Sequence, residues 1–321
     1  MARVAAIDCG TNSIRLLVAD LTDHGDGTAH LRDVHREMRV VRLGEGVDAT
    51  RTLSEAALQR TRAALADYTA ICRRKGAERV RMVATSATRD ATNRDDFFAM
   101  TREVLGVEAE VISGDEEARL SFTGAVGDLE PEDGPFMVTD LGGGSTELVV
   151  GTWDGASATI SGALSVDIGC VRITERCLPS DPPTAEEIAQ ARKLTAETLQ
   201  PAFDTVPIAD ARTWIGVAGT ITTLSAVAQE LPAYDSESTH LSRLSREQIG
   251  RTAEHLLTAT REQRAANPTI HPGRVDVIGG GALITAVLAE KLHSAAGIGE
   301  LLVSEHDILD GIALSLREPR I

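Results

Sequence analysis

Two stretches of the chain run from an apolar strand through a polar turn and back into an apolar strand. In residues 136–150, an apolar run leads to Asp140, three glycines follow, and apolar alternation then resumes. Residues 4–18 repeat this design, with Asp8 at the end of the first strand. Alternation with a period of two on either side of a short Gly-containing turn predicts a β-hairpin in both places.

The turns of both hairpins are suited to binding phosphate. Glycine permits positive φ angles and close approach of a ligand to the backbone, and successive N–H groups in such a turn form an anion-binding nest. A single turn of this kind is also found in ordinary hairpins, but two in one chain indicate two related half-domains that face one cleft. The candidate phosphate-binding residues in the turns are Gly10, Thr11, Asn12, Ser13, Gly142, Gly143, Gly144, Ser145 and Thr146.

Each turn follows an aspartate that can act as a metal ligand. Asp140 and Asp8 stand where a carboxylate can hold Mg²⁺ beside a bound phosphate. This double pattern resembles the two phosphate motifs of the actin/Hsp70/sugar-kinase superfamily.

The rest of the first half alternates between strand and helix patterns. Residues 26–43 predict a further β-ribbon, and Ser54 is placed to cap a long helix that Gly76 ends. Ser113 and Glu116 have the spacing of a capping box at the start of a later helix.

The second half continues the same alternation. We predict a helix over 184–199, a strand over 213–217 and a surface loop over 232–245. The β-branched run at 275–279 predicts a strand, and the apolar positions at 282–292 predict a helix after it. Strands that alternate with helices indicate an α/β fold.

Length and composition narrow the class of protein. A chain of 321 residues with 42% hydrophobic and 25% charged residues predicts one very large or two ordinary globular domains. No apolar run approaches ~20 residues, and the chain enters a strand directly at its start, so we expect a cytoplasmic protein without a membrane span. The four cysteines lack metal-binding spacing and are expected to be reduced.

The charge argues against nucleic acid as a partner. The net charge is −16 and aromatic residues make up only 3% of the chain, so both electrostatic attraction and base stacking are disfavoured. A polyanionic substrate would have to be held locally by basic side chains, Mg²⁺ and backbone N–H groups.

A set of motifs in order along the chain resembles the exopolyphosphatase/guanosine pentaphosphate phosphatase (Ppx/GppA) family. The most characteristic is Ile-Ser-Gly-x-Glu-Glu-Ala-Arg-Leu, placed before Val-x-Asp-x-Gly-Gly-Gly-Ser-Thr-Glu. The resemblance covers essentially the whole chain, and its motifs lie at 8–16, 42–46, 84–89, 112–120, 138–147, 215–220 and 277–281. Longer members of the family carry an additional C-terminal region with an HD-type domain, and this chain resembles the short members.

The resemblance implies a fold as well as a function. It implies an α/β protein of two ribonuclease-H-like domains, of the actin/Hsp70/sugar-kinase type, with the active site in a cleft between them. The first domain is expected to span 1–126 and the second 127–304, with the helix at 305–321 packing back on the first. The boundary falls where glycines and prolines cluster, at Gly127, Pro131, Gly134 and Pro135.

The resemblance also implies the catalytic residues. Hydrolysis of a phosphoanhydride depends mostly on positioning and charge neutralisation, and a carboxylate must orient or deprotonate the attacking water. By resemblance this residue is Glu117, with its neighbour Glu116 as the alternative. Arg89 lies where the family places an arginine that meets phosphate, and Arg15 and Arg42 extend this basic path.

The leading hypothesis is therefore a Mg²⁺-dependent exopolyphosphatase, with Mn²⁺ as a substitute cation, that releases terminal phosphate from short inorganic polyphosphate. The alternative within the family is the conversion of guanosine pentaphosphate (pppGpp) to the tetraphosphate. Homodimers are common in the family, and a homodimer is a candidate assembly here.

Two hypotheses belong to other classes of protein: an ATP-dependent small-molecule kinase and an inactive nucleotide sensor. The family-type Glu117 argues against the kinase, and the complete acidic set of Asp8, Glu117 and Asp140 argues against the sensor.

Overall fold

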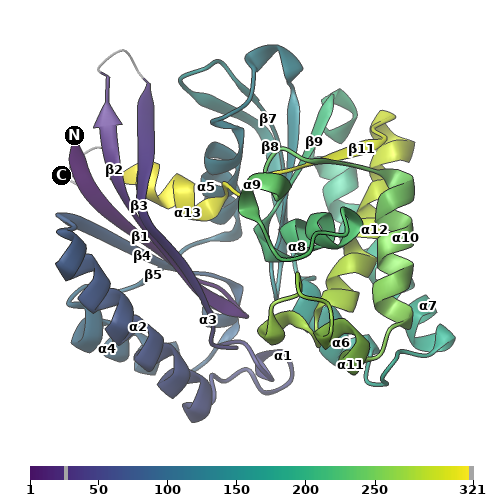
Figure 1. The fold of residues 1–321 in the computed structure, drawn as a ribbon, viewed down its shortest axis with the longest axis horizontal. Coiled ribbons are helices and arrows are strands. Elements are labelled where there is room, and N and C mark those ends of the chain that lie inside the picture. Colours follow the sequence, from purple (N-terminus) through teal and green to yellow (C-terminus); the bar gives the residue numbers. More distant parts are fainter. Residues whose placement is uncertain (25–27, 318–321) are drawn as a thin grey trace. The chain divides into compact units, whose positions relative to one another are not determined.

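A computed structural model describes residues 1–24 and 28–317. Two predicted segments lie partly outside these residues: the start of the ribbon, at 26–27, and the end of the C-terminal helix, at 318–321. The chain divides into two compact units (Figure 1). Unit 1 comprises Met1–Gly127, Asp154–Ala158 and the segment from His306 onward, and unit 2 comprises Asp128–Trp153 and Thr159–Glu305.

Unit 1 is built on a mixed sheet with the strand order β3-β2-β1-β4-β5. The first three strands pair antiparallel, and β4 and β5 continue the sheet parallel to β1. The predicted hairpin at 4–18 is confirmed as β1 and β2. The strands are β1 (Ala2–Cys9), β2 (Ser13–Asp23), β3 (Ala29–Val40), β4 (Arg79–Ala84) and β5 (Glu110–Val111).

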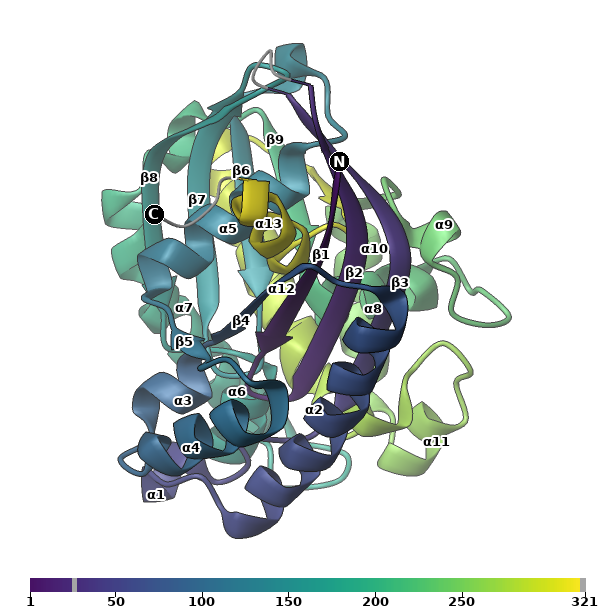
Figure 2. The same ribbon diagram turned by 90° about the vertical axis from the view of Figure 1, so that its left-hand side faces the viewer.

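Helices cover both faces of this sheet. On one face, Ile7 and Leu16 pack with Leu65, Tyr68 and Phe97 of α2 and α4. On the other face, the apolar side chains of α5 and α13 complete a second cluster, and α13 lies against α5 (Figure 2). The helices of unit 1 are α1 (Val47–Thr50), α2 (Glu55–Lys75), α3 (Ser86–Asp90), α4 (Arg94–Leu105), α5 (Gly114–Val126) and α13 (Ile308–Leu314), followed by the 3₁₀ turn η4 (Ser315–Arg317).

Local capping sets the ends of α2 as predicted. The Ser54 side chain accepts a hydrogen bond from the N–H of Ala57, and Gly76 ends the helix with a φ of 75°. An oxygen acceptor satisfies one of the N–H groups that a helix start leaves unpaired, and glycine adopts this left-handed conformation without steric cost.

Two glycines allow α5 and α13 to approach closely. A Cβ atom on Gly124 would lie 1.8 Å from the carbonyl oxygen of Asp307, and a Cβ atom on Gly311 would lie 2.0 Å from that of Leu120. Any other residue at either position would collide with the backbone of the neighbouring helix. This contact fixes where α13 begins relative to α5.

Unit 2 repeats the plan of unit 1 and adds one strand. Its sheet has the order β10-β11-β9-β6-β7-β8, so the run β8-β7-β6-β9-β11 corresponds to β3-β2-β1-β4-β5. The predicted hairpin at 136–150 is confirmed as β6 and β7, which pair antiparallel. The strands are β6 (Phe136–Leu141), β7 (Thr146–Trp153), β8 (Ala158–Val166), β9 (Thr213–Val217), β10 (Arg243–Ser245) and β11 (Glu300–Val303).

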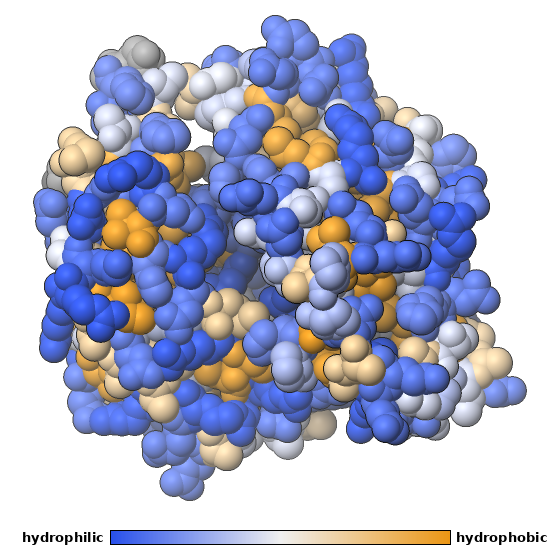
Figure 3. All heavy atoms as spheres, in the orientation of Figure 1, coloured by the Kyte–Doolittle hydropathy of each residue, from blue (hydrophilic) through white to orange (hydrophobic). Residues whose placement is uncertain are grey.

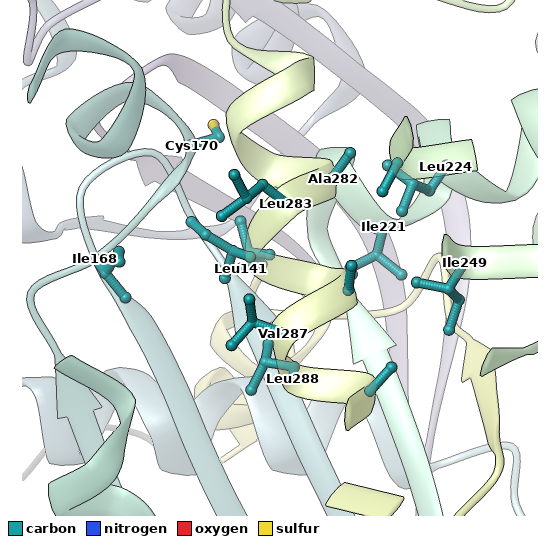
Figure 4. Packing of buried hydrophobic residues seen from close by; sticks show 14 of the residues in the cluster. Leu141, Ile168, Cys170, Ile221, Leu224, Ile249, Ala282, Leu283, Val287 and Leu288 are labelled. Carbon is teal, nitrogen blue, oxygen red and sulfur yellow. The ribbon is translucent and has the colours of Figure 1, made fainter. Parts of the chain in front are cut away.

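The core of unit 2 forms around α12. This helix contributes Leu283, Val287 and Leu288 to a cluster that also contains Leu141 and Ile221 (Figure 4). The helices of unit 2 are α6 (Cys170–Cys177), α7 (Ala185–Thr205), α8 (Ala218–Ala228), α9 (Ser236–Thr239), α10 (Arg246–Thr258), α11 (Arg261–Ala265) and α12 (Ile278–Ala296), with 3₁₀ turns η1 (Pro131–Asp133), η2 (Ile208–Asp210) and η3 (Pro272–Arg274).

The predicted strand at 275–279 is wrong. Helix α12 already begins at Ile278, and its first turn contains glycines packed against other helices. A Cβ atom on Gly280 would lie 2.5 Å from Thr174 Oγ1 of α6, and one on Gly281 would lie 2.4 Å from Thr220 Cγ2 of α8. This close packing between helices outweighs the local β propensity of the preceding Val-Asp-Val-Ile run.

The predicted loop at 232–245 also contains regular structure, since α9 and β10 lie within it.

Among the described residues, no helix combines the length and the apolar character that crossing a membrane requires. The face in Figure 3 is mostly hydrophilic with separate small apolar patches.

Candidate active site

The first predicted phosphate turn is tied to the loop that follows β3. The N–H of Gly10 donates to the carbonyl of Ser13 at 2.9 Å, which closes the turn. The carbonyls of Thr11 and Asn12 accept hydrogen bonds from the segment 41–44, and the hydroxyl of Thr11 lies 2.9 Å from that of Ser86. The turn is therefore held from two sides by elements of unit 1.

The second predicted phosphate turn is held by the start of α6. The N–H of Gly142 donates to the carbonyl of Ser145 at 3.1 Å. The carbonyls of Gly142 and Gly143 in turn accept the N–H groups of residues 170–172. The last residue of the turn, Thr146, donates through its hydroxyl to the carbonyl of Ile168 at 2.6 Å.

Of the two properties predicted for these glycines, the positive φ angles are not found, and the close approach of a ligand to the backbone stays a prediction. The residues with positive φ in the described chain do not include Gly10 or the glycines at 142–144. The second turn does require a glycine at position 169, because a Cβ atom there would lie 2.4 Å from the carbonyl carbon of Gly143. Sequence reasoning missed Gly169, because only the folded chain brings it against the turn.

Asp140 lies directly opposite Glu147 in the register of β6 and β7. Both side chains are buried, with exposed fractions of 5% and 1%. The hydroxyl of Ser165 on β8 donates to Glu147 Oε1 at 2.7 Å. Two ionised carboxylates in directly paired positions repel one another, so this pair is suited to a divalent cation.

Sequence reasoning did not select Glu147. The signal was nevertheless present, because a tight hairpin that pairs Leu141 with Thr146 must also pair Asp140 with the residue that follows Thr146. Carboxylate oxygens are the ligands that Mg²⁺ prefers, and the structure therefore provides a fitting donor set in unit 2.

Asp8 has a different partner at the corresponding position of the first hairpin. It lies opposite Arg15 in the register of β1 and β2. Arg15 donates to Asp8 Oδ2 from Nε at 3.0 Å and from Nη2 at 2.7 Å. Burial raises the pKa of Asp8, and the positive charge of Arg15 opposes this increase. Asp8 Oδ1 is buried and has no hydrogen-bond partner among the described residues, so it is also a fitting cation ligand.

Glu117 and Arg89 lie together in unit 1. Glu117 is in the first turn of α5 and is only 7% exposed. Arg89 Nη1 donates to Glu117 Oε2 at 2.6 Å and to the carbonyl of Ile112 at 3.1 Å. A buried carboxylate held by an arginine has a defined orientation, as a residue that positions water requires.

The neighbouring Glu116 has another environment. Its side chain is 46% exposed and accepts a hydrogen bond from Arg81 Nη2 at 2.6 Å. Only half of the predicted capping box is therefore present: Ser113 accepts the N–H of Glu116 at 3.2 Å, but the Glu116 carboxylate turns to Arg81. The other predicted arginine, Arg42, lies in the loop after β3 with a φ of 50°.

The predicted site residues thus fall into two groups, one in each unit. Unit 1 contains the first turn with Asp8 and Arg15, and separately the pair of Glu117 and Arg89. Unit 2 contains the second turn with Asp140 and the additional residue Glu147.

Comparisons with a protein-family model, with a relative and with two solved structures agree with one another. The model of the Ppx/GppA phosphatase family matches residues 17–316. Exopolyphosphatase 2 of Mycobacterium tuberculosis is 58% identical over 98% of this chain and 99% of its own length. A crystal structure of an exopolyphosphatase-like protein has a TM-score of 0.92 with 43% identity and covers 98% of both chains. The PPX-GPPA enzyme of Aquifex aeolicus has a TM-score of 0.78 with 31% identity and covers 98% of this chain and 99% of its own.

Proposed function

Because the chain belongs to the Ppx/GppA phosphatase family, we propose that it is an exopolyphosphatase. In this proposal it hydrolyses the terminal phosphoanhydride bond of inorganic polyphosphate with Mg²⁺ as the cation, which Mn²⁺ can replace. The observation that supports this substrate most directly is the full-length relative named exopolyphosphatase 2. The structure supports the chemistry, since an arginine holds a buried carboxylate in unit 1 and two buried carboxylates face one another in the register of β6 and β7.

In this proposal, main-chain N–H groups of the two turns bind phosphate oxygens. Glu117 accepts the proton of the attacking water, and Arg89 both orients Glu117 and meets the phosphate that is transferred. Asp140 and Glu147 in unit 2, and Asp8 Oδ1 in unit 1, are the carboxylate oxygens that would hold a divalent cation. When bound, the cation neutralises charge on the phosphate oxygens.

The guanosine pentaphosphate activity is the second candidate, because the matched family is named for both phosphatases. The bond that breaks is the same, and only the leaving group differs. The Glu117 carboxylate, proposed to activate water, favours hydrolysis over transfer to a small-molecule acceptor.

The test is phosphate release with Mg²⁺ from short polyphosphate, long polyphosphate, pppGpp and ATP, measured side by side. We expect release from polyphosphate, loss of release when EDTA removes the cation, and a preference for short chains. Release from pppGpp alone would transfer the assignment to the second candidate. No release from any of the four would overturn the proposal.

Replacement of Gly169 by alanine should impair this activity while the protein remains folded. The added methyl group would meet backbone atoms at 2.4–2.6 Å in the second phosphate turn, so the turn must shift. Since misplacement of binding groups by about 1 Å can cost about 100-fold in rate, we expect kcat/KM for polyphosphate to fall by about this factor.

Gly250→Ala is the matched control, because no atom of the described residues outside its own helix backbone and chain neighbours lies within 4 Å of the added methyl group on α10. It should leave kcat/KM unchanged. Equal activity of the Gly169→Ala variant and the wild-type protein would show that this turn does not position the substrate.

A further inference from the structure

Arg15 is shared between two buried carboxylates of unit 1. Its Nε and Nη2 atoms both donate to the same oxygen, Asp8 Oδ2, at 3.0 and 2.7 Å. Its Nη1 atom donates to Oδ2 of Asp307, a residue that lies at the other end of the chain in sequence. Arg15 is thus held in one orientation by two acceptors.

The contact with Asp8 departs from the usual arrangement of an arginine and a carboxylate. A guanidinium that faces a carboxylate commonly donates one N–H group to each of its oxygens. Here both N–H groups are on Oδ2, and Oδ1 is buried without a hydrogen-bond partner among residues 1–24 and 28–317. A buried oxygen that could accept a hydrogen bond from its neighbour but does not requires an explanation.

Asp307 provides this explanation, because it is itself rigidly held. It caps α13, with Oδ1 accepting the N–H of Leu309 at 2.9 Å, and its own N–H donates to Asp310 Oδ2 at 3.0 Å. Its carbonyl lies against Gly124 of α5, and only 3% of the residue is exposed. A fixed acceptor for Nη1 would restrain Arg15 from rotating toward Asp8 Oδ1.

We propose that Asp307 is a positioning residue that holds Arg15 on one oxygen of Asp8 and so keeps Asp8 Oδ1 available to the divalent cation. This inference rests on the proposed function for the role of the cation. The ligand class is a hard divalent cation such as Mg²⁺ or Mn²⁺, which prefers carboxylate oxygens. The contribution is indirect, since Asp307 acts through Arg15.

The test is Asp307→Asn. The amide oxygen can still cap α13 by accepting from Leu309, but the negative charge that holds Nη1 is gone. We expect a crystal structure of the variant to show Arg15 donating to both oxygens of Asp8. Because loss of residues that orient metal ligands typically weakens metal binding by about 10–100-fold, Mn²⁺ affinity measured by electron paramagnetic resonance should fall by about tenfold.

Asp310→Asn is the matched control on the same helix. Asp310 binds Arg36 through both of its carboxylate oxygens, and its Oδ2 also accepts the N–H of Asp307, a hydrogen bond that the asparagine oxygen can still accept. The substitution changes the net charge by the same amount, yet Mn²⁺ affinity should stay near that of the wild-type protein. Circular dichroism and thermal unfolding of each variant verify that unit 1 remains folded.

A double-mutant cycle with Arg15→Gln isolates the mechanism. If Asp307 acts through Arg15, then adding Asp307→Asn to Arg15→Gln should change Mn²⁺ affinity by less than about twofold. An equal loss in both backgrounds, or a variant structure in which Arg15 stays on Oδ2 alone, would overturn the proposal. These two readouts need no substrate, so a failure of the polyphosphate assay is distinguishable from a failure of this inference.

Discussion

Replacement of Glu117 by glutamine is expected to reduce phosphate release from polyphosphate by about 10²–10⁴-fold in kcat, the usual contribution of a general base. The amide is nearly identical in size and can still accept a hydrogen bond from Arg89, but it cannot take a proton from water. KM should change little, because Glu117 is proposed to act on water rather than to bind phosphate. Steady-state phosphate release with saturating Mg²⁺ measures both parameters.

Glu116→Gln provides the control for this variant. Glu116 is adjacent in sequence and carries the same charge, but its carboxylate faces Arg81 and is 46% exposed. Arg81 keeps Glu110 as an ion-pair partner at 3.0 Å, so activity should remain within about twofold of the wild-type protein. A large loss in the Glu116 variant with an active Glu117 variant would reverse the assignment of the two acids.

Gly124→Ala should cause a large loss of stability in unit 1. The added methyl group would lie 1.8 Å from the carbonyl oxygen of Asp307 and 2.9 Å from the N–H nitrogen of Gly311. Overpacking of this kind typically costs about 1–3 kcal/mol, and here the obstacle is backbone that cannot change rotamer. The gain of about 1 kcal/mol from replacing glycine by alanine within a helix does not compensate.

Gly127→Ala is the comparison, since no atom in the described part of the chain, apart from its neighbours in sequence, lies within 4 Å of the added methyl group. Its φ of −61° is accessible to alanine, so the change should be neutral or slightly stabilising. Amide hydrogen exchange of β1, β2 and α13 reports on unit 1 separately from unit 2. Protection in the Gly124 variant equal to that of the wild-type protein would contradict the close contact of α5 and α13.

Local signals predicted well those elements that depend on local chemistry. The Ser54 cap and the Gly76 end of α2 were predicted correctly because both depend on hydrogen bonds and backbone angles within one turn of the chain. The two hairpins were found because alternation and turn composition are visible over a few residues. Family motifs then identified the Ppx/GppA resemblance, which the family match over residues 17–316 confirms.

The wrong predictions concern segments whose local structure is determined by tertiary packing. The run at 275–279 reads as a strand locally, but its glycines fit against α6 and α8 only as the first turn of a helix. The half-formed capping box at Ser113 follows from Arg81, a residue of β4 that offers Glu116 a charged partner. The glycines of the second turn lack the predicted positive φ, and the close contact that requires a glycine is made by Gly169, which packs against that turn.

By itself, the sequence determined the α/β class, both aspartate-bearing hairpins and the family, and it proposed Asp8, Asp140 and Glu117 as candidate acids. Only the tertiary structure decided which side chains from distant parts of the chain face one another: Glu117 with Arg89, and Arg15 with Asp307. The physical reason is that caps, turns and strand periodicity are short-range properties of the chain. Ion pairs and close helix contacts, in contrast, depend on residues that folding brings together from distant positions, as with Arg15 and Asp307.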